Sequence, residues 1–163
     1  MPDDHHDATL SGERLETWST LATLLEWLPP ALDKALQPSG LTHFEYGMLY
    51  ALEHAPDRTL RLRVLAEYAN SGLPRLSRAL DRLEKRGWVR REPDPEDGRS
   101  TLAVLLPAGR ETLRQATPIH ERNVNRLVFE QLTTAQATEL REACRRILSA
   151  IRDEDGWSPP SAS

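Results

Sequence analysis

The chain has 163 residues, with 21 Lys and Arg against 25 Asp and Glu, and a formal net charge of −4 at pH 7. Its single cysteine excludes an intrachain disulfide framework and a cysteine-based zinc site. Because the sequence has no run of about 18 apolar residues and its first ten residues lack the apolar segment of a secretory signal, it predicts a cytoplasmic protein with no membrane partner.

Positive charge is concentrated in one region of this acidic chain. Between Arg58 and Arg99 the sequence has 11 Lys or Arg residues against 7 Asp or Glu residues, whereas the remainder is strongly acidic. The partner of a basic surface is decided by local charge, so the negative total does not exclude a polyanionic partner.

The first predicted element is a helix over residues 13–36, where apolar side chains recur at helical spacing. Pro29 and Pro30 interrupt this pattern, which predicts either a bend or two abutting helices. For Trp18 and Trp27, which belong to the apolar pattern, filling an interface or core is favoured over contact with a ligand. Residues 1–12 are polar and predicted to be a disordered tail.

Thr42 and Glu45 have the spacing of a capping box, which predicts a second helix from there to about residue 54. Residues 61–68 then form a short predicted helix, and the polar turn at 70–72 leads into the next one. Two helices joined by such a turn are typical of a helix-turn-helix motif.

The chain is organised around residues 71–106, which begin with a predicted helix at about 73–86. Pro74 is tolerated in a first helical turn, where N–H groups lack intrahelical partners, and Gly87 suits a left-handed cap. On the helical wheel, one apolar stripe is formed by Leu76, Ala79, Leu80 and Leu83. The opposite side of the helix carries Pro74, Ser77, Arg78 and Asp81. The flank carries the basic residues Arg75, Arg82, Lys85 and Arg86. A helix with this pattern fits the major groove of DNA.

A β-hairpin is predicted directly after this helix. Residues 88–92 and 101–106 favour strands, and the segment between them is rich in Pro, Asp and Gly, which favour turns. Arg99 lies near the tip of this hairpin. A hairpin beside a recognition helix is a wing, and an arginine at its tip can enter the minor groove.

Two helices are predicted in the C-terminal part. The first begins at Pro107 and runs to about residue 130, with a kink expected at Pro118, and the second follows a capping-box pattern at Thr133 and runs to about residue 152. The apolar line of the last helix has no later partner in the chain, so a second copy is expected to cover it. Residues 153–163 are predicted to be a disordered tail.

The sequences LSRALDRLEKRGWV at 76–89 and DPEDGRS at 94–100 resemble the MarR family of winged helix-turn-helix regulators. The resemblance extends over about residues 13–152. It implies a mainly α fold with a small β wing, in which a winged helix-turn-helix domain over 42–106 is flanked by dimerisation helices at 13–41 and 107–152. It also implies a homodimer that binds a pseudo-palindromic site on double-stranded DNA, most simply as a repressor.

Nine side chains are candidates for DNA recognition and its support. Ser77, Arg78 and Asp81 are expected at base edges, Arg75, Arg82, Arg86 and Arg91 at phosphates, and Arg99 in the minor groove. Asp97 is expected to orient the wing or to pair with Arg99. An equally strong interpretation of Asp81 is a pairing within its own helix, with Arg78, Arg82 or Lys85.

The resemblance further implies a small-molecule effector, anionic or aromatic, bound in a cleft between the dimerisation helices and the winged domain. The candidate lining residues are Trp18, Trp27, His43 and His120. Such an effector would release DNA by favouring a dimer whose recognition helices are wrongly spaced.

Other functions have weaker support in the sequence. No Ser-His-Asp grouping, Gly-rich phosphate loop or paired helical carboxylate is evident, so no enzyme and no cofactor are predicted. A zinc-responsive member of the family would use His43, His54 and His120 with Glu45 or Glu121, although no two of these histidines have helical metal-site spacing. Cys144 as an oxidation sensor is less favoured than Cys144 as a small core residue. The alternative from another class is a dimeric helical module that binds a protein instead of DNA.

Overall fold

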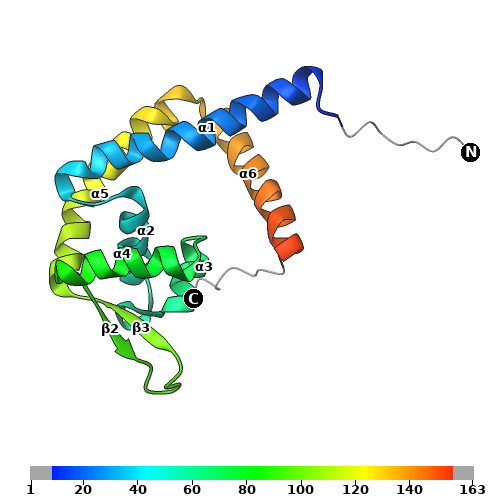
Figure 1. Cartoon of the computed structure of the whole chain (residues 1–163). Helices are drawn as coiled ribbons and strands as arrows, with labels where there is room; N and C mark the ends of the chain where they lie inside the picture. Colours follow the sequence, from blue (N-terminus) through cyan, green and yellow to red (C-terminus); the bar gives the residue numbers. More distant parts are fainter. Residues whose placement is uncertain (1–8, 156–163) are drawn as a thin grey trace, which may run out of the picture. The chain divides into compact units, whose positions relative to one another are not determined.

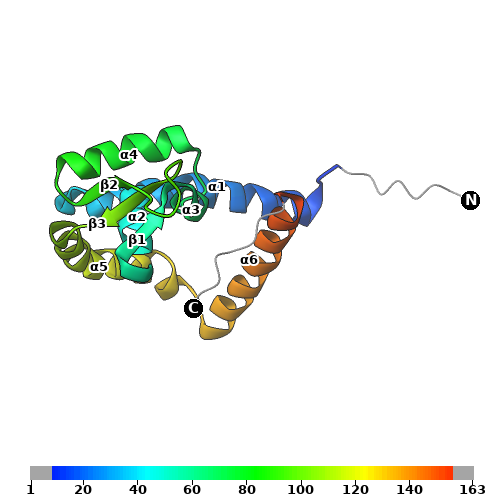
Figure 2. The ribbon, with the colours of Figure 1, turned by 90° about the horizontal axis from the view of Figure 1, so that it is seen from below.

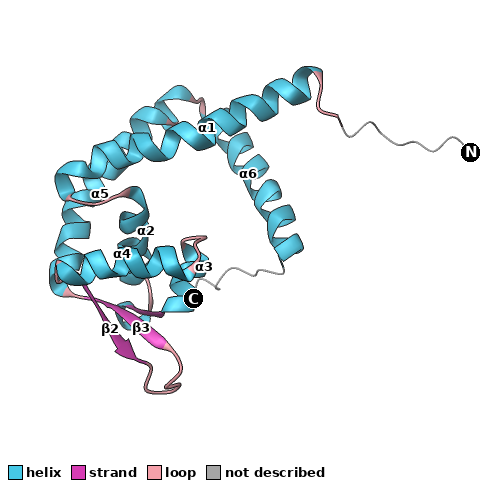
Figure 3. Cartoon of the chain, viewed as in Figure 1, coloured by secondary structure: helices cyan, strands magenta, loops and turns pink. Residues whose placement is uncertain are grey.

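The computed structural model describes residues 9–155 and is mainly helical, with a small three-stranded sheet (Figure 1, Figure 3). The helices are α1 (Gly12–Leu36), α2 (His43–Glu53), α3 (Leu62–Tyr68), α4 (Leu73–Lys85), α5 (Pro107–Leu127) and α6 (Thr134–Asp155). The strands are β1 (Thr59–Arg61), β2 (Val89–Pro93) and β3 (Thr101–Leu105). Short 3₁₀ turns occupy Gln37–Ser39, Pro56–Arg58 and Phe129–Gln131. The predicted fold class is therefore confirmed.

The predictions of disordered tails at 1–12 and 153–163 concern residues that lie mostly outside the described part of the chain, namely 1–8 and 156–163. Within the described part, α6 continues to Asp155, three residues beyond its predicted end. The described chain forms two compact units, which divide within α5 between His120 and Glu121.

Pro29 and Pro30 do not divide the first helix, because α1 runs through both of them. The alternative of two abutting helices was wrong. Each proline removes one backbone donor, which leaves the carbonyl groups of Leu25 and Glu26 without their helical partners. Both of these residues are exposed, so water can satisfy the two carbonyl groups.

The two predicted capping boxes are present. The Thr42 hydroxyl accepts from the Glu45 backbone N–H, and the Glu45 carboxylate accepts from the Thr42 backbone N–H. Thr133 and Gln136 make the same reciprocal pair at the start of α6. These bonds satisfy helix-end donors and fix where α2 and α6 begin.

The sheet has the strand order β1-β3-β2, and both pairings are antiparallel (Figure 2). The hairpin of β2 and β3 was predicted, but β1 was not. Three residues are too few to show an alternating pattern, and the sequence analysis placed Arg61 in the following helix instead. In the structure Arg61 ends β1 opposite Leu102 of β3, which brings it close to the base of the wing.

One core joins α2, α3, α4, the sheet and the first half of α5. Its largest fully buried side chains are Leu36, Met48, Leu49, Leu52, Leu65, Leu76, Leu80, Leu83 and Val89. All four residues of the predicted α4 stripe belong to this core. The burial of that stripe fixes which side of α4 is exposed, and therefore which side chains it can present to a partner.

Candidate nucleic-acid interface

Helix α4 presents its cationic side away from the core. Pro74 lies in its first turn, and Gly87 follows its end with a φ of 69°, a left-handed conformation that glycine adopts without strain. Leu76 and Leu80 are fully buried, while Arg75 and Arg78 are exposed. The helix begins and ends as the sequence predicted, and its polar side faces outward.

Two of the predicted DNA-contacting arginines have free guanidinium groups. Within residues 9–155, the side chains of Arg78 on α4 and Arg99 in the wing make no hydrogen bond or ion pair with other groups, and both residues are exposed. Free, exposed guanidinium groups can bind guanine edges or a narrow minor groove without first breaking an internal contact. These two residues are therefore the strongest candidates for direct contact with DNA.

Arg82 is bound to a buried carboxylate. Its Nε donates to Glu45 Oε1 at 2.7 Å, and the Glu45 side chain is 4% exposed while that of Arg82 is 52% exposed. Glu45 also completes the capping box of α2. The pair thus joins the recognition helix to the first turn of α2, a role that the sequence analysis did not assign to Arg82.

Arg75 and Arg86 stack on aromatic rings. The Arg75 guanidinium lies 4.3 Å from the centre of the Phe44 ring, and that of Arg86 lies 4.8 Å from the Trp88 ring. Arg86 also donates to the backbone carbonyl of Gly40. Both arginines are exposed, so these contacts orient them at the surface of the domain.

Arg91 of β2 clamps the wing to the recognition helix. Its Nε and Nη2 donate to Glu84 Oε2 at 2.8 and 2.5 Å. Its backbone N–H donates to the other oxygen of the same carboxylate, Oε1, at 2.6 Å. Nη2 also donates to Asp81 Oδ1 at 2.5 Å. The hydrogen bond with Glu84 is the main cause that raises the pKa of Arg91 above its ordinary value.

This cluster changes the roles predicted for three residues. Asp81 pairs with Arg91 from another element, so the expectation of a partner on its own helix was wrong. The Ser77 hydroxyl lies within 3.4 Å of Arg91 Nη1. Arg91 is only 28% exposed and already holds two carboxylates, so its geometry is that of a structural clamp and not of a free phosphate ligand.

The loop between β2 and β3 is built on two aspartates. Asp97 Oδ1 accepts from the backbone N–H of Arg99 at 3.1 Å, and its Oδ2 accepts from the Ser100 hydroxyl at 2.8 Å. The hydrogen bond from Ser100 is the largest cause that lowers the pKa of Asp97, and the bond from the Arg99 backbone adds to it. Asp97 therefore holds the backbone of Arg99 and does not bind its guanidinium group.

Asp94 at the start of the same loop is buried, and its carboxylate accepts from Arg61 Nε at 2.7 Å. The sequence analysis missed Arg61, Glu45, Glu84 and Asp94 as functional support. Their partners lie 7 to 37 residues away along the chain. No local spacing rule connects such distant positions, so only the fold reveals these pairs.

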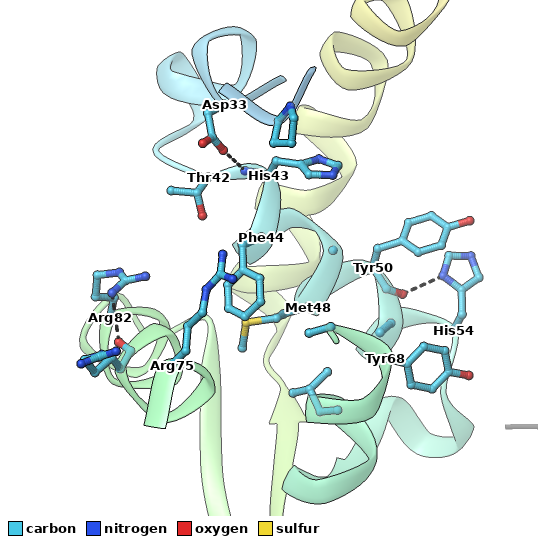
Figure 4. Close-up of a pocket in the computed structure, with 16 residues that line it drawn as sticks. Asp33, Thr42, His43, Phe44, Met48, Tyr50, His54, Tyr68, Arg75 and Arg82 are labelled. Atoms are coloured by element: carbon cyan, nitrogen blue, oxygen red, sulfur yellow. Dashed lines mark hydrogen bonds between the residues drawn. The ribbon is translucent and has the colours of Figure 1, made fainter. Parts of the chain in front are cut away.

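A cleft of about 680 Å³ lies beside the recognition helix (Figure 4). Its walls come from the end of α1, the exposed side of α2, the end of α3 and the cationic side of α4. The polar and aromatic lining residues are Asp33, Thr42, His43, Phe44, Tyr50, His54, Tyr68, Arg75, Arg78 and Arg82. The cleft thus combines aromatic rings with three guanidinium groups.

Of the four predicted pocket residues, His43 alone is among those that line this cleft. Trp18 and Trp27 lie on α1 with exposed fractions of 52% and 75%, and they do not line it. His120 is not a lining residue either, because its ring packs against Tyr46 and His43.

The histidines do not form a metal site in the described part of the chain, where no group of three or more His, Cys, Asp or Glu side chains is placed to hold a metal ion. The rings of His43 and His120 stack with centres 5.5 Å apart, but His54 Nδ1 bonds to the carbonyl oxygen of Tyr50. Burial lowers the pKa of His43, and the Asp33 carboxylate opposes this shift.

Helices α1 and α6 each expose several large apolar side chains. They are Leu15, Trp18, Leu24, Leu25 and Trp27 on α1 and Leu140, Ile147, Leu148 and Ile151 on α6. Cys144 of α6 is also exposed, so it is not the core residue that the sequence analysis favoured. No helix among residues 9–155 is long and apolar enough to cross a membrane.

The domain contains two helices joined by a turn, and the second helix buries an apolar stripe and exposes a free arginine. A hairpin with an arginine at its turn adjoins this helix. Together these features define a winged helix-turn-helix protein. Comparisons with known proteins identify the family. The sequence profile of the MarR family matches residues 39–100. A MarR family transcriptional regulator from Streptomyces coelicolor, Sco3205, solved in complex with DNA, is 39% identical, with 88% of this chain and 94% of that chain covered and a TM-score of 0.84.

Two further proteins are similar over most of their length. AbsC, a MarR family transcriptional regulator from Streptomyces coelicolor, is 32% identical, with 89% of this chain and 98% of that chain covered and a TM-score of 0.84. The transcriptional repressor MprA of Escherichia coli K12 is 27% identical, with 76% of this chain and 71% of that protein covered. The chain belongs to the MarR family of transcriptional regulators.

Proposed function

We propose that this protein is a homodimeric repressor that binds a pseudo-palindromic operator and is released from it by a small aromatic anion. One observation carries the DNA-binding part of this proposal. Arg78 on the recognition helix and Arg99 in the wing are exposed with free guanidinium groups, although most neighbouring arginines are engaged in internal contacts. The pair is suited to read a major groove and the adjoining minor groove.

The other arginines have supporting roles in this proposal. Arg75, Arg82 and Arg86 remain sufficiently exposed to meet phosphates while their internal contacts hold them in place. Ser77 lies at the edge of the same surface. Asp81 and Arg91 act as the clamp between helix and wing, so they influence DNA binding through geometry.

The exposed apolar residues of α1 and α6 support a homodimer. Large apolar patches of this kind are uncommon on the surface of a monomer. Two-fold symmetry then implies two half-sites about one helical turn, or roughly 34 Å, apart.

The composition of the cleft supports an aromatic anion as effector. Phe44, Tyr50 and Tyr68 offer aromatic surface, while Arg75 and Arg78 offer positive charge. Because Arg78 would also read DNA, an anion bound to it competes directly with the operator. This competition requires no change in the spacing of the dimer.

Selection of bound duplexes from a random DNA pool tests the DNA-binding part. The wild type is expected to enrich an inverted repeat, Arg78→Ala to lose or relax one position of each half-site, and Arg99→Ala to bind the same sequence more weakly. Arg114→Ala is the matched control, because Arg114 is an exposed arginine on α5 that pairs with Glu111. No enrichment at low salt would contradict the proposal and favour a module that binds a protein partner.

The effector is tested separately with salicylate as the probe, a simple aromatic carboxylate. Salicylate is expected to raise the Kd of the wild type for the selected duplex. Phe44→Ala, which removes an aromatic wall of the cleft, should weaken this effect while the protein still binds DNA. An unchanged Kd at millimolar salicylate would contradict this choice of effector class.

A further inference from the structure

A buried carboxylate occupies the base of a loop that we assign to DNA binding. The Asp94 side chain is 4% exposed, whereas that of Glu96 two residues later is 86% exposed. A negative charge close to DNA repels the phosphates, so a carboxylate in the wing opposes binding unless it has a structural task.

Asp94 is a hub of the wing loop. Its backbone N–H donates to the Ser100 carbonyl group, its own carbonyl group accepts from Asp97 N–H, and its Oδ1 accepts from the Glu96 backbone N–H at 2.9 Å. Asp97 in turn accepts from the Arg99 backbone N–H. A continuous set of bonds therefore leads from the Asp94 carboxylate to the backbone of Arg99.

The partner of this hub comes from another element. Arg61 ends β1 and precedes α3, and its Nε donates to the second carboxylate oxygen of Asp94 at 2.7 Å. Arg61 is also opposite Leu102 in the pairing of β1 with β3. The sheet thus fixes the backbone of Arg61 beside the base of the wing, where its guanidinium group meets Asp94.

We propose that Arg61 and Asp94 form a positioning pair, which holds the wing so that Arg99 reaches the minor groove. This inference rests on the proposed contact between Arg99 and DNA, and it deepens it by assigning the residues that aim the wing. Arg61 acts through Asp94 and makes no contact with a base. The pair is separate from the Arg91 clamp, which fixes the middle of β2 to α4.

The electrostatic environment of Asp94 agrees with this role. The hydrogen bond from the Glu96 backbone is the largest cause that lowers the pKa of Asp94, and the bond from Arg61 adds to it. Asp94 is therefore ionised at neutral pH, and the asparagine variant changes its charge with little change in its shape.

The decisive measurement is the Kd for the duplex selected by the wild type, compared for wild type, Asp94→Asn and Arg61→Gln. A positioning role predicts that both variants bind about tenfold more weakly. Charge alone predicts the opposite result for Asp94→Asn, because this variant removes a negative charge from the wing. If Asp94→Asn binds DNA as tightly as the wild type or more tightly, the proposal is overturned.

Glu96→Gln is the matched control, because it removes the same charge from the same loop at an exposed position 3.8 Å from Arg61. It is expected to bind DNA as well as or slightly better than the wild type. A tenfold loss in Glu96→Gln as well would overturn the specific role of Asp94. Thermal unfolding is recorded for each variant, and Arg61→Gln carries the test if Asp94→Asn does not fold.

Combination with Arg99→Ala separates the failure of this inference from the failure of the proposed contact. If the pair acts through Arg99, adding Asp94→Asn to Arg99→Ala weakens binding by less than about twofold. If the two losses multiply, the positioning role is overturned while the Arg99 contact stands. If Arg99→Ala alone leaves the Kd unchanged, the proposed contact itself fails and this inference fails with it.

Discussion

Glu45 and Arg82 connect the recognition helix to the element behind it. Glu45 of α2 is buried, yet one of its oxygens accepts from the Thr42 backbone and the other accepts from Arg82 Nε at 2.7 Å. One carboxylate therefore caps α2 and anchors α4. In a protein that presents α4 to DNA, this link limits how far the helix can tilt relative to α2.

Because Glu45 both caps α2 and pairs with Arg82, different substitutions of Glu45 can separate the contributions of the cap and of the ion pair to stability. Glu45→Ala loses both the cap and the ion pair and is expected to lower the free energy of unfolding by about 2 kcal/mol. Glu45→Gln keeps an amide oxygen that can accept from Thr42, so its loss should be smaller. Arg82→Ala keeps the cap but leaves the buried Glu45 carboxylate without its ion-pair partner, so it should cost about 1–3 kcal/mol. Urea denaturation measures these losses, and equal losses for Ala and Gln would show that the cap contributes little.

Arg91 offers a prediction that distinguishes a clamp from a phosphate ligand. Arg91→Ala should destabilise the fold by about 1–3 kcal/mol because it leaves Glu84 and Asp81 without their partner. Arg91→Lys should restore little of this, because an ammonium group cannot reproduce the forked geometry. The slope of log K against log salt for DNA binding should remain unchanged in Arg91→Ala, because a clamp neutralises no phosphate.

A matched control for this clamp is Arg90→Ala. Arg90 is the preceding residue on β2, is exposed and pairs with Glu92 across 2.8 Å. Its loss should change the unfolding free energy by less than about 0.5 kcal/mol. A salt slope reduced by about one in Arg91→Ala would instead indicate a direct phosphate contact.

Gly109 tests how closely α5 packs on the hairpin. A Cβ at this position would lie 2.9 Å from the Trp88 carbonyl carbon and closer still to its oxygen. Because both groups are backbone, Gly109→Ala requires a shift of α5 and should cost about 1–3 kcal/mol. Gly47→Ala on α2 has open space around the new methyl group and should stabilise the helix by about 0.5–1 kcal/mol. Thermal unfolding of both variants checks the opposite signs.

The elements that could be predicted from the sequence are those with local signals. The stripe from Leu76 to Leu83 has a helical period, and the two capping boxes have a fixed spacing, so α4, α2 and α6 were placed correctly. Strand β1 could not be predicted, because its three residues are strand-like only through their pairing with β3. The sequence also could not show which arginines are free, because Arg82 finds its partner 37 residues away and Arg61 finds its partner 33 residues away.

The half-buried ring of His43 predicts a loss of stability at low pH. Burial lowers the pKa of His43 in the folded state, so the unfolded state binds a proton more readily near the ordinary pKa of 6.5. The stabilising contribution is present above pH 6.5 and is lost as the pH falls towards the folded-state pKa. Asp33 limits the shift, and His120 faces the same ring with a stacked imidazole.

Urea midpoints at pH 5.5 and 7.5 measure this dependence. His43→Gln should reduce the difference between the two midpoints, because it removes the titrating group whose pKa burial lowers. If His43→Gln retains the full difference between the urea midpoints at the two pH values, the pH dependence of stability comes from other titratable groups.

The exposed apolar residues predict which helices assemble. Trp18 on α1 and Leu148 on α6 are 52% and 47% exposed, more than is expected for large side chains without a partner surface. A charge placed at either position would have to be buried in a dimer, which costs several kcal/mol. Trp18→Asp and Leu148→Asp should therefore shift the protein from about twice the chain mass of 18.5 kDa towards the monomer.

Sedimentation velocity over a range of protein concentrations measures this shift, with Tyr68→Asp as the control. Tyr68 of α3 is as exposed as Trp18 but lines the cleft instead of the apolar face of α1 or α6. Its variant should remain dimeric. Because a monomer binds one half-site, both monomeric variants should also lose the preference for an inverted repeat over a single half-site. A dimer that withstands charges on both helices would require a different interface, and with it a different spacing of the two recognition helices.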